Sequence, residues 1–339
     1  MSRIRSALTA VVEGEILPAE QMQDVMNEVL AGEATSAQIA AFAIALRMRV
    51  ETPGEIAAAV RAMRDAAHRV DLAPTGPLVD TCGTGGDGAG SINISTLSAI
   101  VVAGAGVSVA KHGNRAVSSR SGSADVLEAL GVKLECSDDV LRTCLREAGI
   151  AFLFAPAHHA ALRHVAPARR ELGMRTFFNL LGPLANPAGA THQLVGVYER
   201  RRTTQMAEVL RELGIAGAWV VHGEGGLDEI APTGTTHVSS WNGSVIDEFE
   251  VTPASFGLDS APLSSLQGGD AAENAQIARR ILGGEKGGPR LAILANAGAA
   301  LFIAGAASTL EAGAAMAAAS IDEGAAANAL KRWAECSHG

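Results

Sequence analysis

The chain has 339 residues, of which 48% are hydrophobic and 19% charged, and its formal net charge is −9 at pH 7. This composition is typical of a well-packed globular protein and excludes an intrinsically disordered chain, while the length favours one large domain plus a smaller one. The negative net charge disfavours a general nucleic-acid binder, because such a protein needs a basic face to displace counterions.

The cysteines and the apolar stretches point to a reduced, non-membrane protein. The four cysteines show no metal-binding spacing, and a chain this long needs no disulfides, so we expect free thiols and a cytoplasmic location. The first residues show no signal-peptide pattern. The longest apolar stretch, 291–307, is interrupted by Asn296 and is rich in Ala and Gly, so it predicts a buried core helix rather than a membrane span.

Helical spacing of apolar residues fills the first 70 positions, with Pro18, Thr35 and Thr52 where helix starts are expected. The predicted helices are 4–12, 19–30, 36–48 and 53–70. A turn-rich linker, 71–77, follows, and the pattern then changes to strands alternating with helices. We therefore predict a helical domain over 1–70, with part of 165–190 as a candidate addition to it, and an α/β domain over 75–339.

Alternating elements characterise the rest of the chain. The predicted strands are 78–81, 107–110, 133–135, 150–154, 192–197, 218–222, 236–240 and 291–294. The predicted helices are 96–105, 123–130, 137–148, 156–173, 203–213, 270–282 and an Ala-rich pair near the C-terminus. Residues 241–258 lack helical period and contain an Asn242-Gly243 turn, which predicts a small antiparallel excursion. The fold class is therefore α/β, with a mostly parallel, helix-flanked sheet whose ligand crevice lies at the carboxyl ends of the strands.

Two segments resemble phosphate-binding loops. A glycine-dense turn at 83–87 precedes an Asn-Ile-Ser-Thr helix start at 93–96, and a basic loop at 111–115 runs into serines. Glycines let backbone N–H groups converge on one point, and a helix N-terminus adds further donors, so a side chain at Gly85 is expected to crowd the loop. Either segment alone is more often an ordinary turn, and neither matches the common nucleotide motifs. Two such loops at one sheet edge predict a ligand with two separated phosphate groups.

Longer motifs extend over almost the whole chain. They are GTGGD (83–87), NIST (93–96), KHGNRAVSS (111–119), SGSADVLEALG (121–131), HVAPARRELGMRTFFNLLGPLANP (164–187), HQLVGVY (192–198) and VVHGEGGLDE (220–229). With these motifs the chain resembles the anthranilate phosphoribosyltransferase family. The resemblance implies a small helical domain on a large sheet domain of nucleoside phosphorylase/phosphoribosyltransferase type. It also implies transfer of the phosphoribosyl group of phosphoribosyl pyrophosphate (PRPP) to the amine of anthranilate in tryptophan biosynthesis, by a cytoplasmic homodimer.

The same resemblance implies the site residues. For PRPP they are Gly83, Gly86, Asp87, Ser91, Asn93, Ile94, Ser95, Thr96, Lys111, His112, Gly113, Asn114, Arg115, Ala116, Val117, Ser118, Ser119 and Ser123. For anthranilate they are Gly83, His112, Asn114 and Arg169. For Mg²⁺ they are Ser95, Asp228 and Glu229. From the residues alone, an adjacent Asp-Glu pair is usually a solvated surface pair, His112 could equally be a structural hydrogen-bonding group, and Arg170 could pair with Glu171.

The chemistry of the implied reaction fits these residue types. As the C1–O bond of the sugar weakens, negative charge collects on the departing pyrophosphate, and Mg²⁺ held by one or two carboxylates stabilises that charge. The amine of anthranilate is already neutral at pH 7, so no catalytic base is assigned, and alignment and electrostatics are expected to dominate.

Two alternatives remain at this point. One is a nucleoside phosphorylase of similar architecture, which is not expected to carry GTGGD, KHGNR and the RRELG helix together. The other is a non-catalytic relative of the fold that binds nucleic acid. The acidic composition and the intact Asp228-Glu229 pair speak against it.

Overall fold

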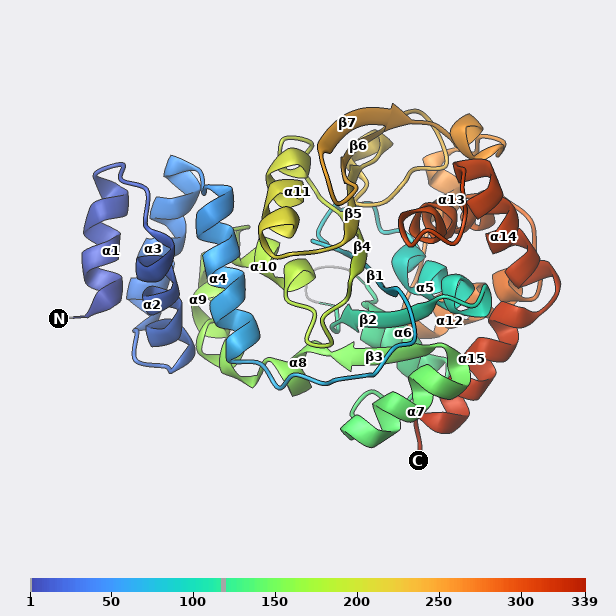
Figure 1. Cartoon of the computed structure of the whole chain (residues 1–339), viewed down its shortest axis with the longest axis horizontal. Helices are drawn as coiled ribbons and strands as arrows, with labels where there is room; N and C mark the ends of the chain where they lie inside the picture. The colour runs from blue at the N-terminus through green and yellow to red at the C-terminus, as the bar shows by residue number, and fades with distance from the viewer. Residues whose placement is uncertain (1, 117–119) are drawn as a thin grey trace.

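The computed structural model describes residues 2–116 and 120–339; Val117, Ser118 and Ser119 lie outside the described residues. Helices fill one end of the molecule, and a twisted sheet covered by helices fills the other (Figure 1). This arrangement confirms the predicted α/β class with an N-terminal helical part.

The N-terminal helices are α1 (Arg3–Val12), α2 (Ala19–Leu30), α3 (Ser36–Arg49) and α4 (Pro53–Asp65). Thr35 and Thr52 begin α3 and α4 with capping boxes: each hydroxyl accepts a backbone N–H of the first turn, and the backbone N–H of each threonine donates to the side chain of Gln38 or Glu55. Helix α4 ends five residues earlier than predicted. The next segment pairs with other parts of the chain instead, through His68 N–H to the His158 carbonyl (2.8 Å) and Val70 N–H to the Pro187 carbonyl (3.2 Å).

Within the described residues, seven strands form one sheet in the order β3-β2-β1-β4-β5-β6-β7. The strands are β1 (Leu78–Gly83), β2 (Ser108–Gly113), β3 (Ile150–Phe154), β4 (His192–Gly196), β5 (Gly217–His222), β6 (Thr236–Trp241) and β7 (Ile246–Val251). The strands from β3 to β5 run parallel, whereas β6 and β7 form the predicted antiparallel excursion.

Helices cover both faces of the sheet. They are α5 (Ile94–Gly104), α6 (Ser123–Ala129), α7 (Asp138–Ala148), α8 (Ala155–His158), α9 (Ala166–Leu172), α10 (Phe178–Leu184), α11 (Arg202–Glu212), α12 (Ala271–Leu282), α13 (Gly288–Ile303), α14 (Leu310–Asp322) and α15 (Ala325–Cys336). Short 3-10 turns are η1 (Ala160–His164), η2 (Glu224–Gly226), η3 (Pro253–Phe256) and η4 (Leu263–Leu266). Among the described residues, no helix is both long enough and apolar enough to cross a membrane.

Four predictions about these elements are wrong. Residues 133–135 form no strand, because Lys133 N–H bonds the Ser337 hydroxyl (2.9 Å) of the C-terminal segment. Residues 291–294 belong to α13, since a short buried apolar run suits a helix as well as a strand. The predicted helix 156–173 is broken into α8, η1 and α9 at His159, whose backbone is not helical. Helix α10 was not predicted.

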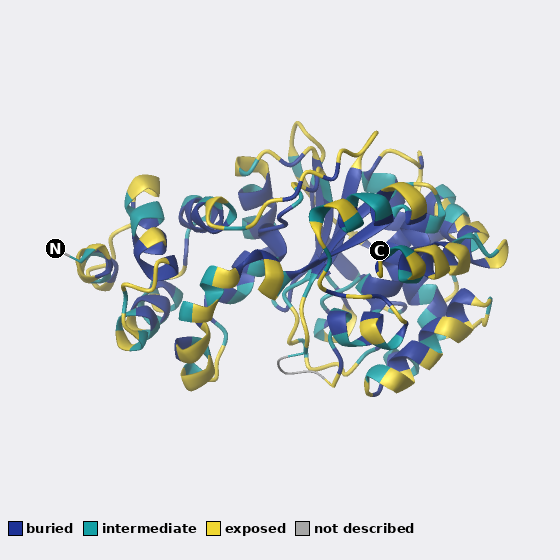
Figure 2. Cartoon of the chain, turned by 90° about the horizontal axis from the view of Figure 1, so that it is seen from below, coloured by how far each residue is buried: buried dark blue, intermediate teal, exposed yellow. Residues whose placement is uncertain are grey.

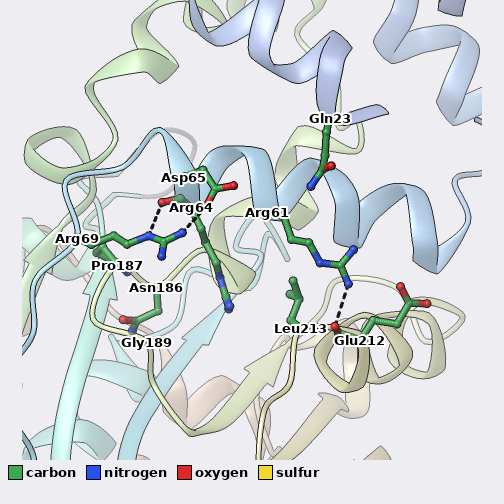
Figure 3. A pocket seen from close by; sticks show the side chains of 10 residues that line it. All are labelled: Gln23, Arg61, Arg64, Asp65, Arg69, Asn186, Pro187, Gly189, Glu212 and Leu213. Atoms are coloured by element: carbon green, nitrogen blue, oxygen red, sulfur yellow. Dashed lines mark hydrogen bonds and ion pairs between the residues drawn. The ribbon is translucent and has the colours of Figure 1, made fainter. Parts of the chain in front are cut away.

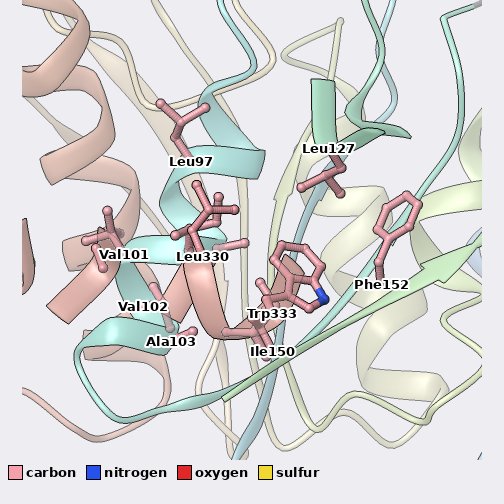
Figure 4. Packing of buried hydrophobic residues seen from close by; sticks show 14 of the residues in the cluster. Leu97, Val101, Val102, Ala103, Leu127, Ile150, Phe152, Leu330 and Trp333 are labelled. Atoms are coloured by element: carbon pink, nitrogen blue, oxygen red, sulfur yellow. The ribbon is translucent and has the colours of Figure 1, made fainter. Parts of the chain in front are cut away.

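Alternating side chains place separate hydrophobic clusters on the two faces of the sheet. On one face, Trp333 and Leu330 of α15 pack with Leu97 of α5 and with Ile150 and Phe152 of β3 (Figure 4). On the other face, strand side chains pack in the same cluster as the N-terminal helices and α10; these include Cys82, Val195, Val197, Ala218 and Val220. Figure 2 shows buried residues, in dark blue, in the N-terminal helices as well as in the sheet. The N-terminal helices therefore pack on the sheet through shared apolar side chains.

Candidate active site

The site lies where the strand order reverses. From β1 the chain proceeds outward to β2 and β3 and then returns to place β4 on the other side of β1. Ligands of open parallel sheets bind at such a switch point, outside the carboxyl ends of the strands. Gly83 and Gly196 end the two strands, and Thr84 N–H bonds the Gly196 carbonyl at 2.9 Å.

The first phosphate loop, residues 83–92, leaves β1 at this point and leads into α5. Gly85 and Gly86 have φ angles of +67° and +74°, which favour glycine. Asp87 Oδ1 accepts the Ala89 N–H at 3.0 Å, which closes a tight turn. A Cβ atom built at Gly85 meets nothing within 4 Å, so the prediction that a side chain there crowds the loop is wrong, and the cost of a substitution comes from the backbone angle.

The carboxylates of Asp228 and Glu229 lie against this loop. They follow β5 and η2, and the Asp228 backbone passes so close to β4 that a Cβ atom at Gly196 would overlap its carbonyl. Asp228 Oδ2 accepts the Gly85 N–H at 2.7 Å, and Glu229 Oε1 accepts the Ser95 N–H at 3.1 Å. The structure thus brings the predicted metal ligands to the loop and to the start of α5.

Loss of solvation raises the pKa of both carboxyls. For Asp228 the neighbouring charge of Asp87 adds to the effect of burial, and for Glu229 the charge of Asp228 does so. Because both carboxyls are hard to ionise, a cation bound beside them would stabilise their charged forms. Two carboxylates are the number that a hard ion such as Mg²⁺ commonly takes from a protein while it keeps several of its waters.

Lys111 is not a surface charge. Its side chain is 2% exposed, and Nζ donates to the Thr81 carbonyl at 2.6 Å and to Ser95 Oγ at 3.4 Å. Beneath it lies Asp80, which is fully buried; burial raises the pKa of Asp80, and the Lys111 ammonium opposes that rise. Asp80 accepts from Asn186 Nδ2 (2.8 Å) and from the His112 N–H (3.2 Å). Sequence reasoning missed Asp80 and Asn186, although Asp80 lies only three positions before the first motif.

The two described ends of the second phosphate loop, 113–116 and 120–122, are held by Asp125 of α6. Asp125 Oδ2 accepts the backbone N–H groups of Ala116 (2.8 Å) and Gly122 (2.9 Å). The Arg115 guanidinium pairs with Asp125 (3.0 Å) and Glu128 (2.9 Å), and these partners raise its pKa. In the structure, then, the predicted phosphate ligand Arg115 is paired with carboxylates of α6.

The His112 side chain is buried, and its imidazole is neutral. Burial lowers its pKa well below the usual value, and so do the neighbouring His159 and His158. The ring lies 5.2 Å from that of His159, and among the described residues His112 Nε2 has no hydrogen-bond partner.

Arg169 and Arg175 lie in the segment that precedes α10. Arg169 on α9 is half-buried, burial lowers its pKa, and within the described part of the chain its guanidinium makes no hydrogen bond or ion pair. Arg175, which sequence reasoning missed, stacks on the ring of Tyr198 at 4.1 Å. A Cβ atom at Gly86 would lie 3.2 Å from Arg175 Nη2, so this cation borders the first loop. The only sequence indication was its place in the RRELGMR motif.

Four other residues predicted to bind PRPP differ in their burial and in their contacts. Ile94 and Thr96 are buried, so their side chains are not open to the crevice. Ser91 bridges to Gln267, and Ser123 Oγ donates to the Asn114 carbonyl at 3.2 Å.

A cavity of about 330 Å³ lies elsewhere, between α4, the loop that precedes β4 and the end of α11 (Figure 3). Its lining includes Arg61, Arg64 and Arg69 but none of the predicted site residues. Arg61 and Arg64 donate to backbone carbonyls of α11 and α10, and Arg69 pairs with Asp65. This cavity is therefore separate from the phosphate loops.

Comparison with known proteins agrees with this geometry. Residues 75–327 match the model of the glycosyl transferase family, a/b domain, and residues 5–67 match that of its helical bundle domain. The chain is 54% identical over 329 residues to the anthranilate phosphoribosyltransferase of Anaeromyxobacter dehalogenans, covering 97% of each chain. It is 51% identical over 332 residues to that of Rhizobium rhizogenes, covering 98% of this chain and 97% of the relative.

Solved structures give the same result. The Thermus thermophilus anthranilate phosphoribosyltransferase superposes with a TM-score of 0.93 at 46% identity, over 98% of this chain and 99% of the other. The Saccharomyces cerevisiae enzyme in complex with PRPP and Mg superposes with a TM-score of 0.90 at 27% identity, over 99% and 98%. With the two loops and the carboxylate pair in place, these similarities show that the chain belongs to the anthranilate phosphoribosyltransferase family.

Proposed function

We infer that this protein transfers the phosphoribosyl group of PRPP to the amine of anthranilate, releasing pyrophosphate and N-(5-phosphoribosyl)anthranilate, in the second step of tryptophan synthesis from chorismate. The observation that carries this inference is the meeting of two phosphate loops and the Asp228–Glu229 pair at the β1–β4 switch point. The full-length similarity to anthranilate phosphoribosyltransferases supports it.

Magnesium is the cofactor of this reaction, and the residues present fit it. Asp228 and Glu229 would hold the ion together with Ser95, whose backbone already contacts Glu229. Bound Mg²⁺ supplies charge stabilisation to the pyrophosphate leaving group. The high pKa of the two carboxyls means that a cation makes it easier for both to ionise.

For the sugar donor, we propose that the two loops bind its separated phosphate groups. The residues proposed for this role are Gly83, Gly86, Asp87, Ser91, 93–96, 111–119 and Ser123, of which 117–119 lie outside the described residues. Lys111 donates to Ser95 Oγ at the start of α5, and its charge favours the ionised form of the buried Asp80.

For anthranilate, we propose a slot formed by Gly83, His112, Asn114 and Arg169. Arg169 has donors without partners among the described residues, and a guanidinium binds a carboxylate with two parallel N–H bonds. Neutral His112 offers a ring that does not repel an attacking amine. No residue acts as a base, since the reaction is governed by alignment and by charge on the leaving group.

We also propose a homodimer in the cytoplasm. Large apolar side chains lie exposed on the N-terminal part: Val12 is 71% exposed, Ile16 64% and Met48 81%. Covering these apolar side chains with a second copy of the chain would be favourable. Light scattering should give about twice the 34.6 kDa chain mass; a monomer mass at micromolar concentration would reject the dimer.

The direct test of the function is the loss of anthranilate fluorescence in the presence of PRPP and Mg²⁺. Omission of PRPP or of Mg²⁺ should stop the loss. A nucleoside phosphorylase would instead cleave nucleosides with phosphate, and a nucleic-acid-binding relative would shift DNA or RNA in a gel at moderate salt. Cleavage of nucleosides, or a shift of DNA or RNA, without consumption of anthranilate would overturn the assignment.

A further inference from the structure

Asn93 stands at the N-cap of α5 but does not cap the helix. An Asn at this position usually accepts an N–H of the first turn through its side chain, and here no such bond forms. Its carboxamide instead reaches sideways: Nδ2 donates to the Ser121 carbonyl of the second phosphate loop at 3.1 Å, and Oδ1 accepts from Asn274 Nδ2 at 2.9 Å. The first-turn N–H groups of α5 are thus left to other partners.

The backbone groups of Ser121 and Gly269, at the two ends of this hydrogen-bonded chain, fix the orientation of both carboxamides. The Ser121 carbonyl can only accept, so Asn93 must present Nδ2 to it and Oδ1 to Asn274. The Gly269 N–H can only donate, and it donates to Asn274 Oδ1 at 2.8 Å, so Asn274 must present Nδ2 to Asn93. Asn274 is 3% exposed, in the first turn of α12. A buried polar chain with every partner made holds a unique geometry.

The segment before α12 also holds the far end of the first loop. Gly268 N–H and Gln267 Nε2 both donate to the Gly90 carbonyl, at 2.9 and 3.0 Å, and Ile92 N–H donates to the Leu266 carbonyl at 2.9 Å. Segment 266–269 and Asn274 therefore connect the first loop, the start of α5 and the second loop to one helix.

From these contacts we propose that Asn274 is a positioning residue for PRPP. It does not reach the crevice itself; it sets the Asn93 carboxamide, and Asn93 sets the separation of the two phosphate loops. A ligand with two phosphate groups a fixed distance apart needs that separation, whereas anthranilate, on the Arg169 side, does not. This inference rests on the proposed function, because it assumes that PRPP spans the two loops.

The test is Asn274→Asp, which keeps the side-chain size and the acceptor for Gly269 but puts a carboxylate oxygen against Asn93 Oδ1. Loss of this bond should raise the KM for PRPP, and its Kd with Mg²⁺ measured by calorimetry, about tenfold, while the KM for anthranilate stays within about twofold. Asn328→Asp makes the same chemical change on the exposed surface of α15 and should alter neither. Should Asn274→Asp fail to fold, Asn274→Ser removes the same donor without a charge.

A second comparison separates positioning from general stability. In an Asn93→Ala background, Asn274→Asp should have no further effect on the KM for PRPP, because its target is gone. An effect that persists in that background, or an equal rise in the KM for both substrates, would overturn the proposal. Turnover by the unaltered enzyme in the same assay tests the proposed function separately.

Discussion

The two phosphate loops differ in how their charges are paired. The first loop offers backbone N–H groups, and acids from a distant segment, Asp228 and Glu229, accept from it and from the adjacent start of α5. The second loop offers a cation, Arg115, and acids of the next helix pair with it. The acids that accept from the first loop thus come from a distant segment, and those that pair with Arg115 come from the helix that follows the second loop. Substitutions at the first should disturb metal and donor together, whereas those at the second should act locally.

The largest expected effect is at the carboxylates of the first loop. Asp228→Ala with Glu229→Ala should lower kcat about a thousandfold, because the leaving-group charge loses its cation. Circular dichroism and the melting temperature should show an intact fold. The exposed pair Asp247 and Glu248 on β7, changed in the same way, is the matched control and should retain full activity. Retained turnover in the first variant would remove both residues from the metal site.

The next largest effect is a difference in stability between substitutions of the two cations of the KHGNRAVSS motif, Lys111 and Arg115. Lys111→Met leaves Asp80 buried without its neighbouring charge, so the free energy of unfolding in urea should fall by about 3 kcal/mol. Arg115→Ala breaks only exposed ion pairs and should cost less than about 1 kcal/mol. Equal losses in the two variants would mean that the burial of Lys111 has no energetic consequence.

A substitution at Arg169 should weaken the binding of anthranilate more than that of PRPP. Arg169→Ala should raise the KM for anthranilate roughly ten- to hundredfold, or about 1.5–3 kcal/mol, with a much smaller change for PRPP. Its exposed neighbour Arg170, changed to Ala, is the control. If both substrates weaken equally and the melting temperature falls, Arg169 is structural.

His159, whose ring packs against that of His112, should make the stability of the fold depend on pH. Burial lowers its pKa to about 4, whereas the unfolded chain titrates near 6.5, so the unfolded state binds more protons between these values. Its contribution is complete above pH 6.5 and falls as the pH falls. Between pH 7 and pH 5 the free energy of unfolding should drop by about 2 kcal/mol less in His159→Gln than in the unaltered protein.

Urea titrations at the two pH values measure this difference. His338→Gln, at an exposed position, should leave the pH dependence unchanged. A His159→Gln profile parallel to that of the unaltered protein would contradict the assignment of a buried neutral ring.

The smallest effect is expected at Gly85. Gly85→Ala and Gly214→Ala both place a side chain at positive φ in open space, so each should lose about 1 kcal/mol of stability. Only Gly85→Ala should also raise the KM for PRPP, by a few-fold, since only Gly85 lies in the first loop. An identical kinetic profile for the two variants would show that the backbone angle of Gly85 has no part in binding.

Local motifs could be predicted from the sequence, and long-range partners could not. The strand, glycine turn and helix start of 78–104 follow from neighbouring residues, so that unit was predicted to within a few residues. Asp80, Arg175 and Asn274 matter through partners about 30, 90 and 180 positions away, for which a single sequence has no spacing rule. The strand predicted at 291–294 failed for a related reason, because the burial that surrounds an apolar run decides between helix and strand.

The measurement that tests the central claim most directly is calorimetric titration of PRPP into the unaltered protein and into the Asp228→Ala, Glu229→Ala variant, each with and without Mg²⁺. If the carboxylate pair holds the metal against the loop-bound phosphates, Mg²⁺ should tighten PRPP binding in the unaltered protein and have little effect in the variant. Equal affinity with and without Mg²⁺ in the unaltered protein, or the same Mg²⁺ dependence in both proteins, would contradict the account.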